Sequence, residues 1–492
     1  MQAQDGLPQD RVKLVASTGD ISAGRSPPPT SEAAGDEHAF SGPYDDALSY
    51  FETTQWTADG TALLTTSSTN LVSGYIVPED LLSASSRPLT LKRQAGIQLP
   101  EPSNVLSGAP YFSLAEPWTQ QLLVSARDHP LQLFYLAPSS PTPGSSHPPI
   151  SSYPFTKARS ETFLNATSLL WPSPGTHFIA GARSLLARFD VQRTGEEPIM
   201  RIRTIPSERH LSKGGGVGMR GTVSALGGQP MDMGSGASLV AAGTWTRWVG
   251  LYDFAQAGEC VATWSVAAAV RDTTSSVGGG NKGDSLGSIG GDGITQTVWS
   301  PCGRYLIICE RKSRGALIYD VRVTGKLLGH LTGRDALGNQ RVFCDVFPSA
   351  DENGGFEVWS GTSGGTVKVW EGVGNQQGPH APAWEWEAHQ STIGSTCVHS
   401  SGTVVATCAG SWEFPDEDQD PGQRVSHGGS GQRHGSDSEN YSDDDESGSE
   451  TDESETQAHW MQRRNKESSL KIWSIAALGG STEELTDTKC SG

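Results

Sequence analysis

Arginine residues recur at one point of a repeated pattern in this 492-residue chain. Arg127, Arg183 and Arg311 each stand at the end of the second strand of a unit. Arg247 and Arg314 lie just beyond the equivalent point and extend the set. A guanidinium group is a planar fork that can donate two hydrogen bonds to one phosphate, so phosphate binding is the chemistry that such an array favours.

Aromatic residues lie beside some of the arginines. Trp245 and Trp248 flank Arg247, and Phe343 follows two residues after Arg341. Arginine beside aromatic rings is the composition that binds unpaired bases and the RNA backbone. We therefore regard Arg341 and Phe343 as RNA-binding candidates together with the five recurring arginines.

The same arginines could instead serve the fold alone. Carboxylates such as Asp128 and Glu310 stand beside them in the sequence, and ion pairs to these groups would fix strand edges. Exposed pairs of this kind contribute little stability. The residue types leave both interpretations open.

Signals for catalysis or cofactor binding are weak. The pattern GxGxxG occurs at Gly216, Gly218 and Gly221, but no strand pattern leads into it and no helix pattern follows. The dinucleotide-binding fingerprint needs that context. Motifs of metalloproteases, serine hydrolases and P-loop enzymes are absent, and no His or Cys cluster has metal-ligand spacing. We predict no catalytic residue, no metal site and no cofactor.

The elements that carry the arginines are short alternating strands. An apolar strand, a Gly-containing turn, a second strand, a tight turn and a strand ending in an aromatic residue form a unit that recurs. Seven units begin near residues 50, 111, 161, 221, 292, 341 and 393. Single sheets of this kind bury both faces only when they stack radially. The prediction is an all-β protein, a seven-bladed WD-repeat β-propeller.

A propeller assigns roles to several residues of the pattern. The turns that carry the arginines lie on one face, so the guanidinium groups would form a ring there. The aromatic strand ends, such as Trp370, are expected to pack between blades. In WD repeats a histidine precedes the innermost strand. His330 and His389 stand at that place, and we expect them to be buried structural histidines.

Composition divides the chain into five regions. Pro-, Ser- and Gly-rich or charged stretches without periodicity cannot bury enough apolar surface to fold. One exception is the stretch RVKLVAS, residues 11–17, which alternates like a strand without indicating a partner. The predicted regions are a disordered N-terminal tail (1–40), the propeller blades (41–410), an acidic disordered insertion (411–467), a final propeller strand (468–478) and a disordered C-terminal tail (479–492).

One acidic tract dominates the charge balance. The net charge is −19, and residues 411–457 contribute −13 from 15 acidic residues and two arginines, which leaves −6 for the rest. An acidic pI is therefore no argument against RNA binding by the folded part. Acidophilic kinases favour serines with an acidic residue three positions later, although a solvating spacer is the alternative. The predicted phosphorylation sites are Ser436, Ser442, Ser447 and Ser449.

Hydropathy and cysteine usage bear on the compartment. No run of about 18 apolar residues exists, so no membrane segment is expected, and the N-terminus lacks the apolar core of a signal peptide. The seven Cys form no CxxC pair and no regular framework. A reduced compartment, cytosol or nucleus, fits this usage best.

Several segments resemble one family of nuclear WD-repeat proteins, the telomerase Cajal body protein 1 family. The Asn-Gln-Arg start, the Phe-x-Asp-x-x-Pro strand and the Ser-Gly-Thr-Ser-Gly turn within residues 339–372 are similar to its sixth blade. Residues 125–134, 41–70 and 399–417 resemble its second, first and last blades. The likeness runs in order along most of the chain, and Arg127 and Arg341 fall in matching segments.

The resemblance implies a scaffold rather than a catalyst. Members of the family bind small Cajal-body RNAs and telomerase RNA and help to deliver these particles to Cajal bodies. We therefore expect a nuclear, monomeric scaffold, localised to the Cajal body where one exists. The expected partners are small nuclear RNA, its ribonucleoprotein proteins and other proteins that contact the propeller faces, with no membrane.

Two alternative functions remain open from the sequence. A related yeast WD-repeat protein is associated with spliceosomal small nuclear ribonucleoproteins, which would imply a factor in pre-mRNA splicing. Asp320 and Arg322 in LIYDVR close a box found in WD-repeat substrate receptors of cullin ubiquitin ligases. The same box also serves blade packing in many WD proteins.

Overall fold

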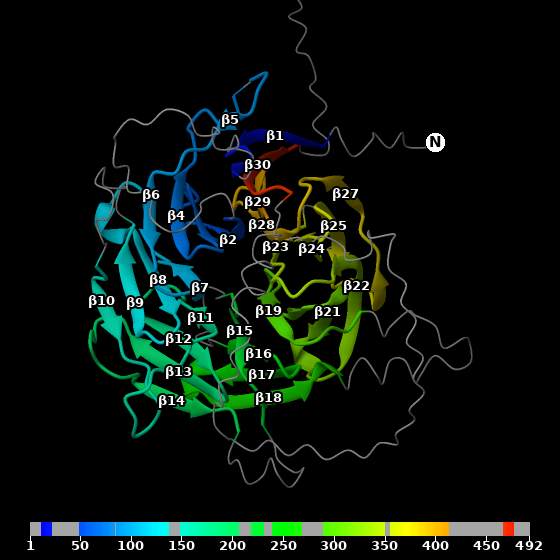
Figure 1. Ribbon diagram of the computed structural model, residues 1–492. Helices are drawn as coiled ribbons and strands as arrows, with labels where there is room; N and C mark the ends of the chain where they lie inside the picture. The colour runs from blue at the N-terminus through cyan, green and yellow to red at the C-terminus, as the bar shows by residue number, and fades with distance from the viewer. Residues whose placement is uncertain are drawn as a thin grey trace, which may run out of the picture.

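The computed structural model contains seven β-sheets arranged as blades around a central axis (Figure 1). In six blades the first strand along the chain lies nearest the axis, and the next three strands follow outward in antiparallel order. In the seventh blade the N-terminal strand of the chain pairs outside three strands from the C-terminal part. No complete α-helix lies within the described residues. The predicted all-β, seven-bladed propeller is therefore confirmed. The structure describes residues 11–21, 49–83, 85–136, 148–205, 218–230, 239–267, 289–349, 355–412 and 466–476.

The first four blades are regular four-stranded sheets. The first blade comprises β2 (Phe51–Trp56), β3 (Ala62–Ser67), β4 (Leu71–Ile76) and β6 (Ala95–Gln98). The second comprises β7 (Ser103–Gly108), β8 (Gln121–Ala126), β9 (Leu131–Tyr135) and β10 (Ser151–Tyr153). The third comprises β11 (Ser168–Leu170), β12 (His177–Ala182), β13 (Leu185–Asp190) and β14 (Met200–Arg203). The fourth comprises β15 (Val223–Gly228), β16 (Leu239–Thr244), β17 (Trp248–Asp253) and β18 (Glu259–Ser265).

Of the last three blades, the fifth and the seventh carry a fifth strand at the outer edge, and the sixth has four strands. The fifth comprises β19 (Ile294–Trp299), β20 (Tyr305–Glu310), β21 (Ser313–Asp320) and β22 (Leu327–Ala336), with β26 (Gly378–His380) beside β22. The sixth comprises β23 (Cys344–Pro348), β24 (Phe356–Gly361), β25 (Thr366–Val373) and β27 (Trp384–Glu387). The seventh comprises β28 (Ile393–Val398), β29 (Val404–Ala409), β30 (Ser469–Ile475) and β1 (Val12–Ser17), with β5 (Leu89–Thr90) beside β1. Within the described ranges three short 3-10 helices are assigned, η4 (Pro117–Thr119), η5 (Phe254–Gln256) and η6 (Val321–Val323).

The strand β1 corrects the prediction that all of residues 1–40 are disordered. It pairs antiparallel with β30, with Val12 opposite Ile475 and Ser17 opposite Lys471. Ala16 of β1 is completely buried. Without β1 the backbone groups along the outer edge of β30 would lack ladder partners, and an unpaired edge is a liability in any sheet. The alternation of residues 11–17 was thus a genuine strand signal.

The second blade begins earlier than its predicted start near residue 111. Its innermost strand, β7, runs from Ser103 to Gly108, and residues 109–120 form the connection to β8. Pro110 and Pro117 lie in that connection. Proline has no backbone N–H to donate to a ladder, so this stretch cannot continue a central strand. The apolar residues Tyr111 and Phe112 gave a strand-like pattern without the backbone chemistry of one.

The aromatic strand ends pack between blades, as predicted. Trp370 of β25 is completely buried and contacts a cluster that combines Ile307 and Cys309 of the fifth blade with Phe356 of the sixth. Its indole Nε1 donates to the Thr332 carbonyl of the fifth blade at 3.2 Å. Burial of a large aromatic side chain is among the strongest apolar contributions to a core. The repeated strand ending therefore joins each blade to its neighbour.

A hydrogen-bonded chain ties the last blade together. His389 Nε2 lies 2.8 Å from Thr407 Oγ1, which also accepts from Trp473 Nε1 at 2.9 Å. On its other side, His389 Nδ1 lies 3.1 Å from Glu467 Oε1. His330 and His389 are each only 7% exposed, so their prediction as buried histidines is confirmed.

Glu467 should stabilise this blade measurably. Burial by itself would raise the Glu467 pKa, but hydrogen bonds from His389, Lys471 and Ser469 outweigh burial and hold that pKa well below its usual value. We expect Glu467→Gln to lower the free energy of unfolding by about 1–3 kcal/mol at pH 7, because a neutral amide replaces a charge-assisted acceptor.

The pH dependence of this loss follows from the lowered pKa. A carboxyl group whose pKa is lower in the folded state stabilises the fold fully when the pH is above the pKa of the unfolded state, near 4.5. This stabilisation is lost progressively as the pH falls below 4.5. Thermal unfolding at pH 7 and pH 3 should therefore give a smaller difference between wild type and variant at pH 3. The exposed Glu387 provides the matched control as Glu387→Gln. Equal losses from the two variants at pH 7 would contradict this role for Glu467.

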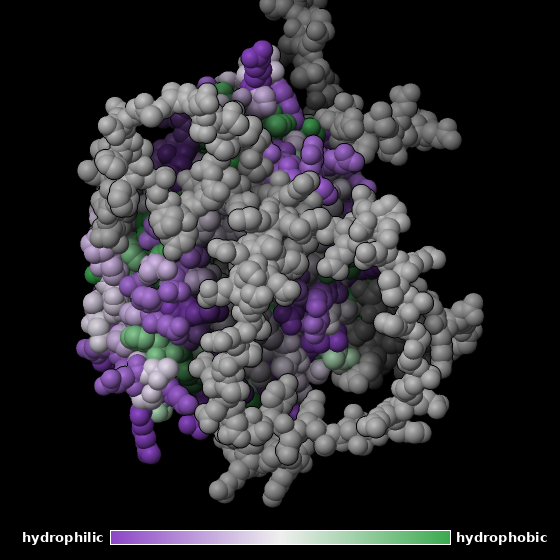
Figure 2. Space-filling model, in the orientation of Figure 1, coloured by the Kyte–Doolittle hydropathy of each residue, from purple (hydrophilic) through white to green (hydrophobic). Residues whose placement is uncertain are grey.

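The surface of the described part is mostly hydrophilic in the view of Figure 2, with small scattered hydrophobic areas. Within the part of the chain that the structure describes, no helix is long and apolar enough to cross a membrane. The same residues contain no group of three or more His, Cys, Asp or Glu side chains that could hold a metal ion.

Candidate nucleic-acid interface

Antiparallel topology places two kinds of connection at the same end of every blade. The turn between the second and third strands and the loop that enters the next innermost strand both lie at the end where the innermost strand begins. We call the end of the propeller formed by the second-to-third-strand turns 127–130, 183–184, 245–247 and 311–312 the arginine face. Arg127, Arg183, Arg247, Arg311 and Arg314 therefore share one face, as the sequence predicted.

The local geometry of these turns explains how the arginines are presented. Asp128, Ser184 and Lys312 have φ values of 56°, 53° and 52°, so the residue after each of Arg127, Arg183 and Arg311 is left-handed. In the fourth blade the left-handed residue is Arg247 itself, with φ 64°. Arg247 thus stands one position later than the others, and its side chain leaves the turn in a different direction.

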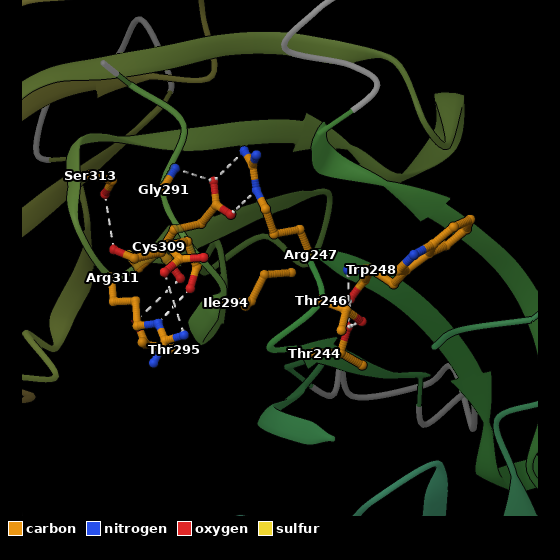
Figure 3. Close-up of polar contacts among 12 residues, drawn as sticks. Thr244, Thr246, Arg247, Trp248, Gly291, Ile294, Thr295, Cys309, Arg311 and Ser313 are labelled. Atoms are coloured by element: carbon orange, nitrogen blue, oxygen red, sulfur yellow. Dashed lines mark hydrogen bonds and ion pairs between the residues drawn. The ribbon is translucent and has the colours of Figure 1, made fainter. Parts of the chain in front are cut away.

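Arg247 is bound by a carboxylate of the neighbouring blade (Figure 3). Its Nε donates to Glu310 Oε1 at 2.6 Å and its Nη2 donates to Glu310 Oε2 at 3.0 Å. The Gly291 N–H donates to the same carboxylate at 2.9 Å, and the Glu310 side chain is only 1% exposed. Two nitrogens on one edge of the fork donate to a buried acceptor, so we assign Arg247 to the packing of the fourth and fifth blades.

The other turn arginines differ in their partners. Arg311 Nη2 lies 3.6 Å from Asp292 Oδ2 and its Nε donates to the Asp292 carbonyl, while a third of the side chain stays exposed. Arg127, Arg183 and Arg314 are exposed. Among the described residues none of these three has a carboxylate within ion-pair distance. Their guanidinium groups are therefore available to a ligand.

Arg341 lies at the centre of this face rather than on the ring of turns. It belongs to the loop 337–343 that leads into β23, and it lines the central cavity together with Phe343. Burial lowers the pKa of Arg341, and the nearby Glu52 carboxylate opposes that shift. Phe343 is half-buried, and its backbone N–H donates to the Gly394 carbonyl at 2.8 Å.

A buried arginine that the sequence did not single out holds this loop. Arg334, at the end of β22, is 1% exposed. Its Nη2 donates to the Val342 carbonyl at 2.6 Å, and its Nη1 donates to the Glu310 carbonyl at 3.2 Å. Its Nε donates to Ser360 Oγ at 3.3 Å. Arg334 thereby connects the fifth and sixth blades and fixes the backbone next to Arg341.

The predicted serines at 436, 442, 447 and 449 lie outside the described residues, so their modification stays a prediction. The residues on either side of the acidic insertion are placed: Ala409 at the end of β29 lies opposite Ser469 at the start of β30. The insertion thus interrupts the second-to-third-strand turn of the seventh blade. That position is equivalent to the arginine turns of the other blades.

Comparisons with known proteins support the resemblance drawn from the sequence. No protein-family model matches the chain. Curated bovine and human proteins are each 24% identical, over 376 and 379 residues respectively, or 75% of this chain. The chain resembles telomerase Cajal body protein 1. The predicted resemblance is confirmed at this distant level, and the alignment spans 59% of the length of telomerase Cajal body protein 1 from either mammal.

A fungal protein matches at a similar level. The Schizosaccharomyces pombe guanine nucleotide-binding protein negative regulator 1 is 23% identical over 326 residues, which cover 66% of this chain and 71% of that protein. Together with telomerase Cajal body protein 1, it supports a WD-repeat scaffold.

Proposed function

We propose that the chain is a nuclear scaffold that binds RNA, in ribonucleoprotein particles, through the arginine face. The observation that carries the proposal is the set of exposed arginines without carboxylate partners in the described structure, Arg127, Arg183 and Arg314. They come from the second, third and fifth blades. Contacts spread over several blades suit an extended phosphate backbone better than a small compact anion.

Exposed aromatic surface on the same face favours single-stranded RNA. Trp245, in the turn of the fourth blade, is 42% exposed. Bases that are not paired can stack on such a ring, and this stacking contributes about 1–3 kcal/mol per base. Small nuclear RNAs of the Cajal-body type, or telomerase RNA, are the class that the resemblance favours. Localisation to the nucleus and its Cajal bodies is part of the same proposal.

The ubiquitin-ligase alternative gains no support from the structure. Arg322 donates to both carboxylate oxygens of Asp320, from Nε to Oδ1 at 3.0 Å and from Nη2 to Oδ2 at 2.7 Å. The ion pair lies within the turn that η6 forms. Blade packing is therefore the role that these contacts support for Asp320 and Arg322. The spliceosomal alternative uses the same RNA-binding surface and differs only in the RNA bound.

Neutralising the free arginines tests the proposal. We expect the triple variant Arg127→Gln, Arg183→Gln, Arg314→Gln to bind single-stranded RNA about 10–100-fold more weakly near physiological salt. The slope of log affinity against log salt should shrink by about 2, since each lost phosphate contact removes about 0.7. Fluorescence anisotropy with a labelled oligonucleotide over a salt series measures both quantities.

The opposite face provides a matched control. Arg193, Arg304 and Arg322 lie in turns at the other end of the blades, and their replacement by Gln makes the same change in net charge. The control variant should keep the wild-type affinity within about twofold. If both variants weaken RNA binding equally, the loss of affinity reflects net charge alone and not the arginine face. If the triple variant of the arginine face keeps the wild-type affinity, the arginine face is not the RNA site.

A further inference from the structure

The central channel of the propeller opens on the arginine face into a mouth with a distinctive set of side chains. The cavity has a volume of about 1030 Å³ and is lined by the innermost strands and the loops that enter them. Cavities of this size hold ligands as large as a nucleotide. Five lining residues concern the argument, and we call them the channel mouth: Tyr50, Glu52, Arg341, Phe343 and Trp412.

Arg341 is half-buried at the mouth and has few partners. Its Nη2 donates to the Thr167 carbonyl at 3.5 Å, a long hydrogen bond. Thr167 directly precedes β11 of the third blade, whereas Arg341 leads into the sixth, so the side chain reaches across the channel. No carboxylate of the described residues lies within ion-pair distance of Arg341. A partly desolvated guanidinium with so few acceptors can gain from a ligand that supplies them.

Glu52 supplies an acceptor at the same mouth. It belongs to β2, and burial raises the pKa of its carboxyl while the charge of Arg341 lowers it. No hydrogen bond to its carboxylate occurs within the described residues. A ligand that satisfies both groups needs an anionic part for Arg341 and a hydrogen-bond donor for Glu52. A nucleotide offers both, as a phosphate and as the amino or imino groups of a base.

Aromatic side chains complete the mouth. Tyr50 and Trp412 meet edge to face, with ring centroids 5.3 Å apart, and Phe343 lines the same cavity. Aromatic rings beside an arginine form the stacking platform on which proteins hold single bases. Tyr50 precedes the first blade, Phe343 the sixth, and Trp412 follows the second strand of the seventh, so only the closed ring brings the three together.

We propose that the channel mouth holds one unpaired nucleotide of the bound RNA. Its phosphate accepts from the Arg341 guanidinium, its base contacts the aromatic side chains, and the Glu52 carboxylate accepts from the base edge. This inference rests on the proposed RNA-binding function and assigns the face a second, central contact. The turn arginines bind the RNA backbone around the mouth. The mouth binds one nucleotide that is unstacked from the rest of the RNA.

A mononucleotide tests the mouth apart from the turn arginines. Adenosine 5′-monophosphate should bind to the full chain, and Arg341→Met should weaken it about tenfold or more, in line with the loss of a charge-assisted contact. The triple variant of Arg127, Arg183 and Arg314 should bind it as wild type does. Calorimetry or saturation-transfer NMR measures this affinity, and Arg322→Met on the opposite face is the matched control.

Inorganic phosphate separates a nucleotide site from a simple anion site. The nucleotide should bind more tightly than phosphate, and Phe343→Leu should remove that difference while phosphate binding persists. Equal affinities for the two ligands in wild type would overturn the base contact. Glu52→Gln serves as a second variant if Arg341→Met does not fold, and it should weaken the nucleotide without weakening phosphate.

The RNA complex distinguishes the failure of this inference from the failure of the proposed function. An oligonucleotide that contains 2-aminopurine should change its fluorescence on binding to wild type, because one base leaves the stack, and not on binding to Arg341→Met. Tight RNA binding without any change in fluorescence would contradict the nucleotide site at the channel mouth. It would still agree with RNA binding by the arginine face. Nucleotide binding that depends on Arg341, without any binding of RNA, would overturn the proposed function and leave a nucleotide site.

Discussion

Replacing Arg247 with methionine should lower the free energy of unfolding at pH 7 by about 2–4 kcal/mol. The substitution leaves the Glu310 carboxylate, 1% exposed, with the Gly291 N–H as its remaining donor in the described structure. Removing one partner of a buried ion pair is costly because the other charge stays desolvated. The value lies below the full range for buried pairs because the Arg247 side chain is 24% exposed.

Chemical denaturation of three variants checks this reasoning. Arg322→Met is the matched control, because its fork binds Asp320 with similar geometry while the arginine side chain is 59% exposed. That variant should lose much less stability than Arg247→Met, because solvent screens an exposed ion pair. The double variant Arg247→Met, Glu310→Leu should recover much of the loss, because it removes the stranded charge. A small loss from Arg247→Met alone would return Arg247 to the set of ligand-binding candidates.

Replacing Arg334 with methionine should also cost about 2–4 kcal/mol, for a different reason. No carboxylate pairs with this buried guanidinium in the described structure, and it binds neutral acceptors instead, including the carbonyls of Glu310 and Val342. Removing a desolvated charge is favourable, which offsets part of the loss. The unsatisfied Val342 carbonyl and the cavity beside it outweigh that gain.

The Arg334 variant has a second effect that separates positioning from bulk stability. Val342 adjoins Arg341, so loosening its carbonyl should displace the channel mouth. Adenosine 5′-monophosphate should therefore bind more weakly to folded Arg334→Met at a temperature well below its unfolding midpoint. Arg334→Lys keeps the charge but lacks the fork and should recover only part of both properties. Unchanged nucleotide binding by a destabilised variant would limit Arg334 to joining the blades.

The propeller could be predicted because its signal is local. Alternating strands, glycine turns and terminal aromatic residues such as Trp370 occur within a few residues of one another. The role of β1 could not be predicted, since its partner β30 lies more than 450 residues along the chain. The short strands β5 and β26 were missed as well, because two or three residues carry no periodicity.

The site was predictable only in part, for the same physical reason. The turn position of Arg127 and Arg183 repeats along the sequence, whereas the partner of Arg247 depends on which blade stands next to it. Glu310 was one of two carboxylates that the sequence offered, and a separation of 63 residues hides the pairing. Arg341 and Phe343 of the channel mouth were candidates from the sequence, but Tyr50, Glu52 and Trp412 gave no signal, because they meet the other two only when the ring closes.

The most direct test of the central claim is a map of where bound RNA contacts the full chain. Ultraviolet crosslinking of a single-stranded RNA, followed by mass spectrometry of the attached peptides, gives that map. The proposal predicts crosslinks in the arginine turns, at residues 127–130, 183–184 and 311–314, and in the loop 337–343. Crosslinks confined to turns of the opposite face, such as 57–61, 191–199 and 321–326, would contradict it.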